Sequence, residues 1–274
     1  MLPSLGLKAS TSLEQTNERL QYHPSVFEFY TDEHDMTKNG LTHLEEMIKY
    51  VQSVGIKHIV IHHPMAYDHH HNEVAVSALK DPVGYQFMMS SAEALIELAI
   101  KLNVQVLIHG GYSDKESVVN SYGNFKAARK VIFTRLDYFQ KMGGNHVMFE
   151  NSISPTFDYG DEDVEETVIA HHYRLCYDIS HGFIVLHGDN DKLVKSVARL
   201  APQTVHYHFV DSMGQYHDSL ELGKGKIDWR RVMKVVNPKA INIYEIDLAD
   251  QNDSREMRAS HDYLTNLLVT QKKS

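Results

Sequence analysis

Six acidic or imidazole side chains each end a short apolar run of this sequence. They are His62, His109, Glu150, Asp178, His208 and Glu245. Side chains alternate along a strand, so Glu150 shares a face with Met148 and Glu245 shares a face with Ile243. If both faces point inward, the two carboxylates lie close together, and a bound dication makes their ionised forms favourable. The pattern therefore predicts a metal site.

The predicted metal ligands are Glu150, Asp178, His208 and Glu245. Oxygen and nitrogen donors of this kind suit Mn, Mg, Co or Zn, and the set holds no thiolate that would demand zinc. Four ligands leave coordination positions open for a substrate. Further candidates for metal or substrate contacts are His62, His109, His181 and His217. Any one of these residues alone could equally be a solvated cap or a core histidine, so the prediction depends on the whole set.

Short strand-like runs alternate with longer segments of helical spacing. The eight runs are Leu5–Ala9, Val26–Tyr30, His58–His62, Gln105–His109, His146–Glu150, Leu175–Asp178, Val205–His208 and Ile241–Glu245. The helical segments are Leu41–Val54, Ser90–Leu102, Phe125–Met142, Asp191–Leu200 and Glu256–Val269. This alternation predicts a parallel sheet, and eight units without a GxGxxG fingerprint favour a closed (β/α)8 TIM barrel, a single α/β domain over residues 1–274. In such a barrel the carboxyl ends of the strands carry the active site.

Composition limits the kinds of partner and the cell compartment that we expect. The formal net charge of −9 argues against nucleic acid as a partner and favours a small-molecule substrate. The single cysteine, Cys176, cannot form an internal disulfide and is expected in a buried strand. The sequence has no apolar run long enough for a membrane span and no secretion signal, so we expect a cytoplasmic protein with no membrane partner. A homo-oligomer is left open.

Several motifs together resemble the xylose isomerase-like TIM barrel superfamily. They are Glu150-Asn151 after an apolar strand, Asp178 with His181, His208 through Asp211, the segment 223–229 (GKGKIDW), and Glu245. This superfamily includes sugar isomerases and epimerases, and the endonuclease IV type of phosphodiesterase (AP endonuclease family 2). The resemblance implies a divalent metal held by the four predicted ligands. It also implies proton transfer by Glu150 and Glu245 on a sugar, sugar phosphate or related polyhydroxy carbonyl compound, with His181 on a substrate oxygen, and thus a role in carbohydrate metabolism.

Two alternatives remain. A multi-metal zinc phosphodiesterase of the endonuclease IV type would use His62 and His109 as ligands, but this sequence has Gln215 where an Asp-x-His pair ending at His217 would need aspartate. The second alternative is a barrel that binds a metabolite without turnover. The ketose 3-epimerases also place an arginine after the seventh strand, where this chain reads Gly214-Gln215-Tyr216-His217, so the substrate is left open.

Three local features are harder to interpret. Lys224 and Lys226 could hold a substrate phosphate beside glycine N–H groups, or could lie in a turn before a helix capped by Asp228. The run of histidines at 69–71 is expected in a solvated loop. Glu28 belongs to no motif and could orient groups at the barrel mouth.

Overall fold

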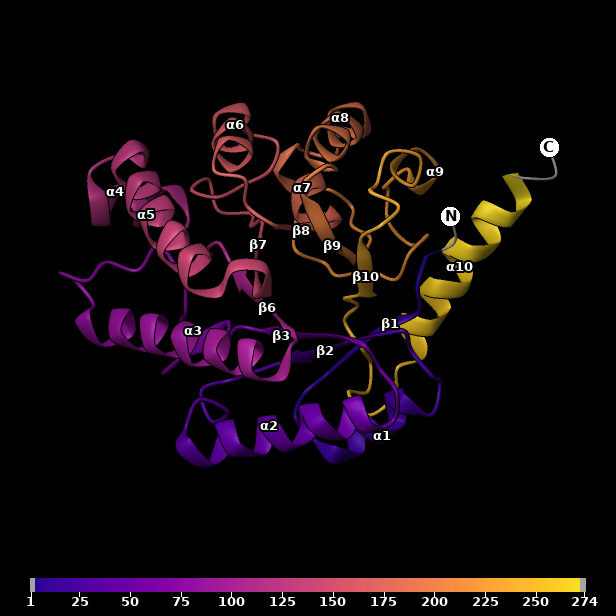
Figure 1. The fold of residues 1–274 in the computed structure, drawn as a ribbon. Coiled ribbons are helices and arrows are strands. Elements are labelled where there is room, and N and C mark those ends of the chain that lie inside the picture. Colours follow the sequence, from indigo (N-terminus) through magenta and orange to yellow (C-terminus); the bar gives the residue numbers. More distant parts are fainter. Residues whose placement is uncertain (1–2, 272–274) are drawn as a thin grey trace.

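Eight parallel strands form the centre of the protein in a computed structural model that describes residues 3–271 (Figure 1). They are β1 (Gly6–Ala9), β2 (Val26–Tyr30), β3 (His58–His62), β6 (Gln105–His109), β7 (Val147–Glu150), β8 (Leu175–Asp178), β9 (Thr204–Phe209) and β10 (Ile241–Tyr244). Neighbours in the sheet follow chain order from β1 to β10. The predicted (β/α)8 barrel is therefore confirmed, and every strand boundary lies within one residue of its expected position.

Helices surround the strands (Figure 1). They are α1 (Leu13–Leu20), α2 (Lys38–Ser53), α3 (Pro82–Leu102), α4 (Lys115–Tyr122), α5 (Phe125–Gly143), α6 (Glu162–Ala170), α7 (Ile179–Val185), α8 (Asn190–Leu200), α9 (Trp229–Val232) and α10 (Arg255–Gln271), with a 3-10 turn at Gly144–His146. The expected start of α3 at Ser90 was wrong. The helix begins eight residues earlier because Asp81 accepts the Gly84 N–H at 2.8 Å and Pro82 occupies the first turn.

Four helices were not predicted: α1, α4, α6 and α7. All are short, at seven to nine residues, and so offer little periodicity to detect. The four-residue α9 was predicted only as one of two interpretations, from its cap Asp228. The segment of three histidines is also more ordered than expected. Its side chains are exposed, as a solvated loop predicts, but His70–His71 (β5) pairs with Ala66–Tyr67 (β4) in a small hairpin after β3.

The barrel closes between its first and last strands, β1 and β10, through a very close backbone approach. A Cβ atom on Gly6 would lie 1.9 Å from the carbonyl oxygen of Asn242, so no larger residue fits there. The Asn242 side chain joins the same edges, since it accepts the Ser4 N–H at 3.1 Å and donates to the Ser4 carbonyl at 3.0 Å.

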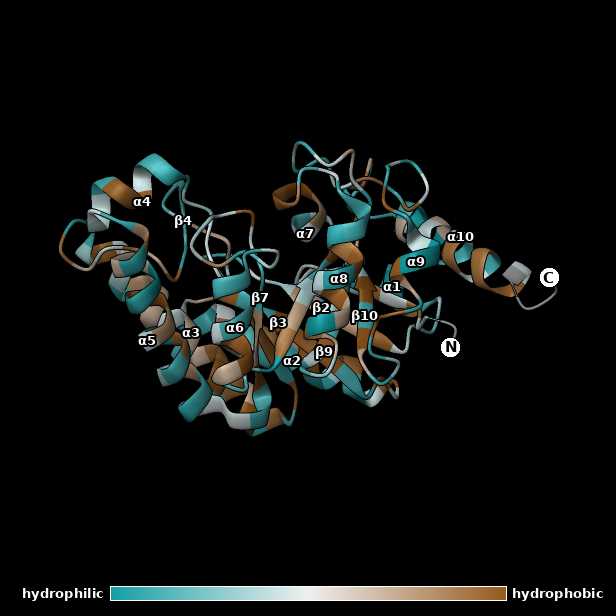
Figure 2. Cartoon of the chain, turned by 90° about the horizontal axis from the view of Figure 1, so that it is seen from above, coloured by the Kyte–Doolittle hydropathy of each residue, from teal (hydrophilic) through white to brown (hydrophobic). Residues whose placement is uncertain are grey.

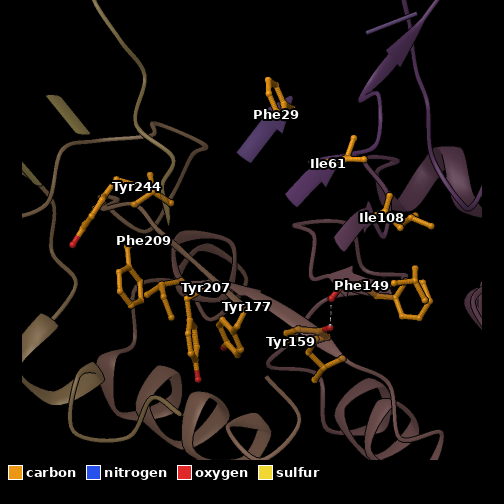
Figure 3. Close-up of a cluster of buried hydrophobic side chains, with 14 of the residues drawn as sticks. Phe29, Ile61, Ile108, Phe149, Tyr159, Tyr177, Tyr207, Phe209 and Tyr244 are labelled. Carbon is orange, nitrogen blue, oxygen red and sulfur yellow. Dashed lines mark hydrogen bonds between the residues drawn. The ribbon is translucent and has the colours of Figure 1, made fainter. Parts of the chain in front are cut away.

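Alternation along the strands divides the barrel into an apolar outer layer and a lined lumen. Figure 3 shows the outward layer, which the helices cover; its labelled strand residues are Phe29, Ile61, Ile108, Phe149, Tyr177, Tyr207, Phe209 and Tyr244. Tyr159, from the loop before α6, packs against Tyr177 of this layer. A separate buried cluster fills the lumen: Val60, Leu107, Met148 and Cys176. In Figure 2 the strands are largely hydrophobic, whereas the helices carry mixed colours. Each predicted site residue at a strand end follows an outward residue and therefore points inward, above the lumen cluster.

None of the helices within residues 3–271 combines the length and apolar character that crossing a membrane requires. Cys176 is a free thiol and is buried, as the sequence predicts.

Candidate active site

The four predicted metal ligands lie side by side at the carboxyl ends of β7, β8, β9 and β10. One ligand atom from each of Glu150, Asp178, His208 and Glu245 lies within 4.8 Å of the others. Nδ1 of His208 is 2.9 Å from a Glu150 oxygen and 2.6 Å from a Glu245 oxygen. Residues separated by almost 100 positions in the chain thus converge, because the barrel brings the ends of all its parallel strands to one mouth.

Two atoms of this group are buried without a hydrogen-bond partner, namely Nδ1 of His208 and Oδ2 of Asp178. The other Asp178 oxygen is occupied, since it accepts the His181 N–H at 2.7 Å and the Ser180 hydroxyl at 2.9 Å. Unpaired buried polar atoms are rare in folded proteins, and many of those that occur lie beside a bound ion or water. Three carboxylates and one imidazole, with free lone pairs facing one another, fit a divalent cation that takes oxygen and nitrogen donors.

Three of the four additional histidines border the same carboxylate. His62 places Nε2 3.2 Å from Oε2 of Glu150. Ligand atoms of His109, Glu150 and His181 form a second group within 4.8 Å, and Nε2 of His109 is buried without a partner. Glu150 therefore belongs to both groups.

A cavity of about 370 Å³ opens above these groups. Its lining consists of His62, Met65, His109, Tyr112, Glu150, His181, His217, Asp218, Ser219, Glu245, Ile246 and Asp247. His217, the fourth additional candidate, lies at the rim with its ring centre 4.9 Å from that of His181. The Tyr112 ring stacks on His109 at 4.2 Å. All eight predicted site residues thus lie in or directly beneath one cavity.

A buried charged layer beneath the cavity was largely missed from the sequence. Glu28 is fully buried and binds Nε2 of His206 at 2.9 Å and Nε2 of His208 at 3.2 Å. Lys8 contacts Glu245 directly and lies 3.6 Å from Glu28. The available signal was a single charge inside each of two apolar strands, which is exceptional because charged residues are seldom fully buried.

Electrostatics in this layer favour ionised carboxylates. Burial raises the pKa of Glu150 and of Glu245, but the neighbouring positive groups together outweigh burial and hold each pKa well below its ordinary value. His208 contributes most, aided by His62 at Glu150 and by Lys8 at Glu245. Burial raises the pKa of Asp178. Burial lowers the pKa of His181, yet the charges of Asp178 and Glu150 overcome this and raise the pKa. The glutamates are consequently charged and able to accept a cation or a proton.

The glycine-lysine segment 223–229 wraps around a buried carboxylate. Asp211 accepts the Gly223 N–H at 2.8 Å, the Ile227 N–H at 3.2 Å and the indole N–H of Trp229 at 3.0 Å. Asp228 caps α9 by accepting the Arg231 N–H at 3.2 Å. Of the two interpretations of this segment, the capped turn is the one that the structure contains.

Comparison with known families gives a match over most of the chain. Residues 77–267 match the family described as "Xylose isomerase-like TIM barrel". Among curated proteins, an uncharacterized protein of Methanocaldococcus jannaschii, MJ1614, is 25% identical over 146 residues, which cover 51% of this chain and 53% of that protein. The alignment thus spans about half the length of the relative.

Solved structures show the same fold along nearly the whole chain. A D-tagatose 3-epimerase-like protein superposes with a TM-score of 0.71 at 17% identity, covering 98% of this chain and 99% of its own. The 3-keto-D-glucoside 4-epimerase YcjR from E. coli, in its apo form, gives a TM-score of 0.67 at 13% identity, with 96% and 99% covered. A xylose isomerase domain protein from Planctomyces limnophilus gives 0.66 at 12% identity, with 99% of both chains covered.

Proposed function

Since the chain belongs to the xylose isomerase-like TIM barrel family, we propose that it is a metal-dependent isomerase or epimerase of a sugar or related polyhydroxy carbonyl compound. The observation that carries this proposal is the meeting of Glu150 and Glu245 on one imidazole nitrogen, Nδ1 of His208, at the floor of one cavity. Similar folds occur in proteins described as sugar epimerases, which supports the choice of a carbohydrate.

Glu150, Asp178, His208 and Glu245 would hold the divalent ion, which would polarise the substrate carbonyl and acidify the adjacent C–H. One glutamate would accept the proton from that carbon, and the other would return a proton from its own side. Their low pKa values suit proton acceptance only while a strong polarising group acidifies the C–H, because a weakly basic carboxylate has little driving force of its own.

His181 is held for a substrate contact. Its Nδ1 is 2.9 Å from the Asn151 carbonyl oxygen, so the Nδ1 hydrogen donates there and Nε2 is left for the cavity. The raised pKa favours the protonated ring, in which Nε2 also carries a hydrogen. His181 would then donate to a substrate oxygen on which negative charge develops.

The test is exchange of substrate C–H hydrogen with heavy water, measured by NMR on a panel of ketohexoses with the Mn²⁺-loaded protein. Glu150→Gln and Glu245→Gln should each abolish exchange. Glu165→Gln is the matched control, because Glu165 is buried like Glu150 but lies on α6 outside the cavity. Retained exchange in both site variants would refute the assignment of the bases, and bound metal is measured in every variant to separate lost ligation from lost proton transfer.

A hydrolase with several metal ions is the second candidate. It is favoured by the group of His109, Glu150 and His181, which shares Glu150 with the first group. Elemental analysis of protein purified without chelator separates the two functions. One Mn, Mg or Co per chain supports the isomerase, whereas two or three zinc ions, together with phosphodiesterase activity lost in His109→Ala, support the hydrolase.

A further inference from the structure

We infer that the cavity selects an uncharged polyhydroxy substrate and rejects phosphorylated ones, because acidic side chains line its rim and the described lining holds no lysine or arginine that could bind a phosphate. This inference rests on the proposed function and narrows its substrate class. It depends on three features: the charges of the lining, the hydrogen bonds of the glycine-lysine segment, and the charge of the ligand set.

The rim carries two carboxylates, Asp218 and Asp247, that no lysine or arginine among residues 3–271 pairs with. One Asp218 oxygen accepts the Met213 N–H at 2.9 Å, and the other is shielded from solvent without a hydrogen-bond partner. The charge of a carboxylate at a cavity wall repels a phosphate but not a neutral hydroxyl group.

Lysine and arginine are absent from the described lining of the cavity. The nearest buried ammonium, Lys8, is held by Glu245 and Glu28 and is only 7% exposed. Phosphate groups in proteins are usually bound by arginine, lysine or free backbone N–H groups at a helix N-terminus. The described cavity wall therefore has neither a lysine nor an arginine to hold a phosphate.

Backbone N–H groups of the glycine-lysine segment 223–229 do not supply a phosphate site either. Two of them donate to Asp211 instead. A Cβ atom on Gly225 would lie 2.2 Å from the Asp211 carboxylate, so a negatively charged group already lies against this glycine. The Lys224 ammonium pairs with Glu221.

A bound divalent metal ion would not make the charge of the cavity positive. The ligand set Glu150, Asp178 and Glu245 carries three negative charges, which exceed the two positive charges of one divalent ion. The buried Lys8 offsets the nearby Glu28. Even with a positive His181 ring, the metal-loaded site would carry no net positive charge before the rim carboxylates are counted, while a metal could still bind neutral hydroxyl and carbonyl oxygens.

The experiment compares matched ketohexoses that differ only in a phosphate: D-fructose, D-tagatose and D-psicose, each against its 6-phosphate. C–H exchange in heavy water gives kcat/KM on the Mn²⁺-loaded protein, and calorimetry gives affinity. We expect the free sugar to be preferred in each pair. Asp218→Asn and Asp247→Asn should each shift the preference towards the phosphate about five- to tenfold at low ionic strength, and less in added salt.

Asparagine at 218 still accepts the Met213 N–H, so the loop geometry is kept. Asp163→Asn, at an exposed position on α6 away from the cavity, is the charge-matched control and should leave the preference unchanged. A preference for the phosphorylated sugars in the unaltered protein would overturn the inference while leaving the isomerase in place. If Asp218→Asn and Asp247→Asn leave the preference between free and phosphorylated sugar unchanged, the inferred role of the rim is wrong. Exchange with no sugar of either kind would remove the proposed function itself.

Discussion

Glu28 offers the sharpest test of how the buried layer supports the proposed metal ligands. Its carboxylate binds both His206 and His208 and lies 3.6 Å from Lys8, entirely shielded from solvent. Glu28→Gln preserves the shape of the side chain and removes its charge. We expect two separable losses, one in metal affinity and one in the stability of the fold.

The metal loss follows from the orientation of His208. Nδ1 of this ring faces Glu150 and Glu245, so Nε2 must carry the hydrogen and donate it to Glu28 when Nδ1 binds a cation. Removal of such a partner typically weakens metal binding about 10- to 100-fold, which corresponds to about 1.4 to 2.7 kcal/mol. The stability loss follows from Lys8, which loses one of its two carboxylates, and we expect about 3 kcal/mol for a broken buried charge pair.

Calorimetric titration of the chelator-treated protein with Mn²⁺ measures the first loss, and urea unfolding in chelator measures the second. Glu165→Gln is again the matched control. Glu165 is buried, accepts the Gly160 N–H at 3.0 Å and pairs with Arg199 at 3.2 Å, so its amide variant should lose stability and keep metal affinity. If Glu28→Gln lowers stability but binds Mn²⁺ as tightly as Glu165→Gln does, Glu28 merely supports the fold and the reasoning about His208 is wrong.

Three further outcomes are expected. Chelation should lower the melting temperature reversibly, with about 2.7 kcal/mol regained at a free Mn²⁺ concentration about 100 times Kd, and an unchanged melting temperature would argue against a resident ion. Gly6→Ala should destabilise the fold by several kcal/mol or prevent folding, seen in urea unfolding, because its Cβ would meet the Asn242 carbonyl at 1.9 Å. Burial, with the charge of Asp161, raises the pKa of Asp158 to about 6, so the stability that its neutral form contributes is present below about pH 4 and lost as pH rises through about 6. Asp158→Asn should therefore gain up to about 3 kcal/mol over the unaltered protein near pH ~8 and little near pH ~4, and a gain independent of pH would contradict this.

Strand positions and strand-end residues were predictable because one local rule governs both. Each strand is a short apolar run, and alternation turns the residue after an outward aromatic or aliphatic side chain towards the lumen, as in Phe149 followed by Glu150. Most helices shorter than ten residues were not predicted, for the opposite reason. The start of α7 is fixed by a single hydrogen bond from the His181 N–H to Asp178, which leaves no periodic trace in the sequence.

Lys8 and Glu28 mark the limit of such reasoning. Each lies inside a strand rather than at its end. Pairing of β1 with β2 sets Lys8 opposite Glu28, whereas Lys8 reaches its second carboxylate, Glu245, only when β1 and β10 close the barrel. That closure joins residues more than 230 positions apart, so no local pattern reveals it. The same closure has a chemical consequence. Lys8 holds one Glu245 oxygen while the other faces His208, so this glutamate would offer a bound cation only a single oxygen, which would leave room for a substrate oxygen.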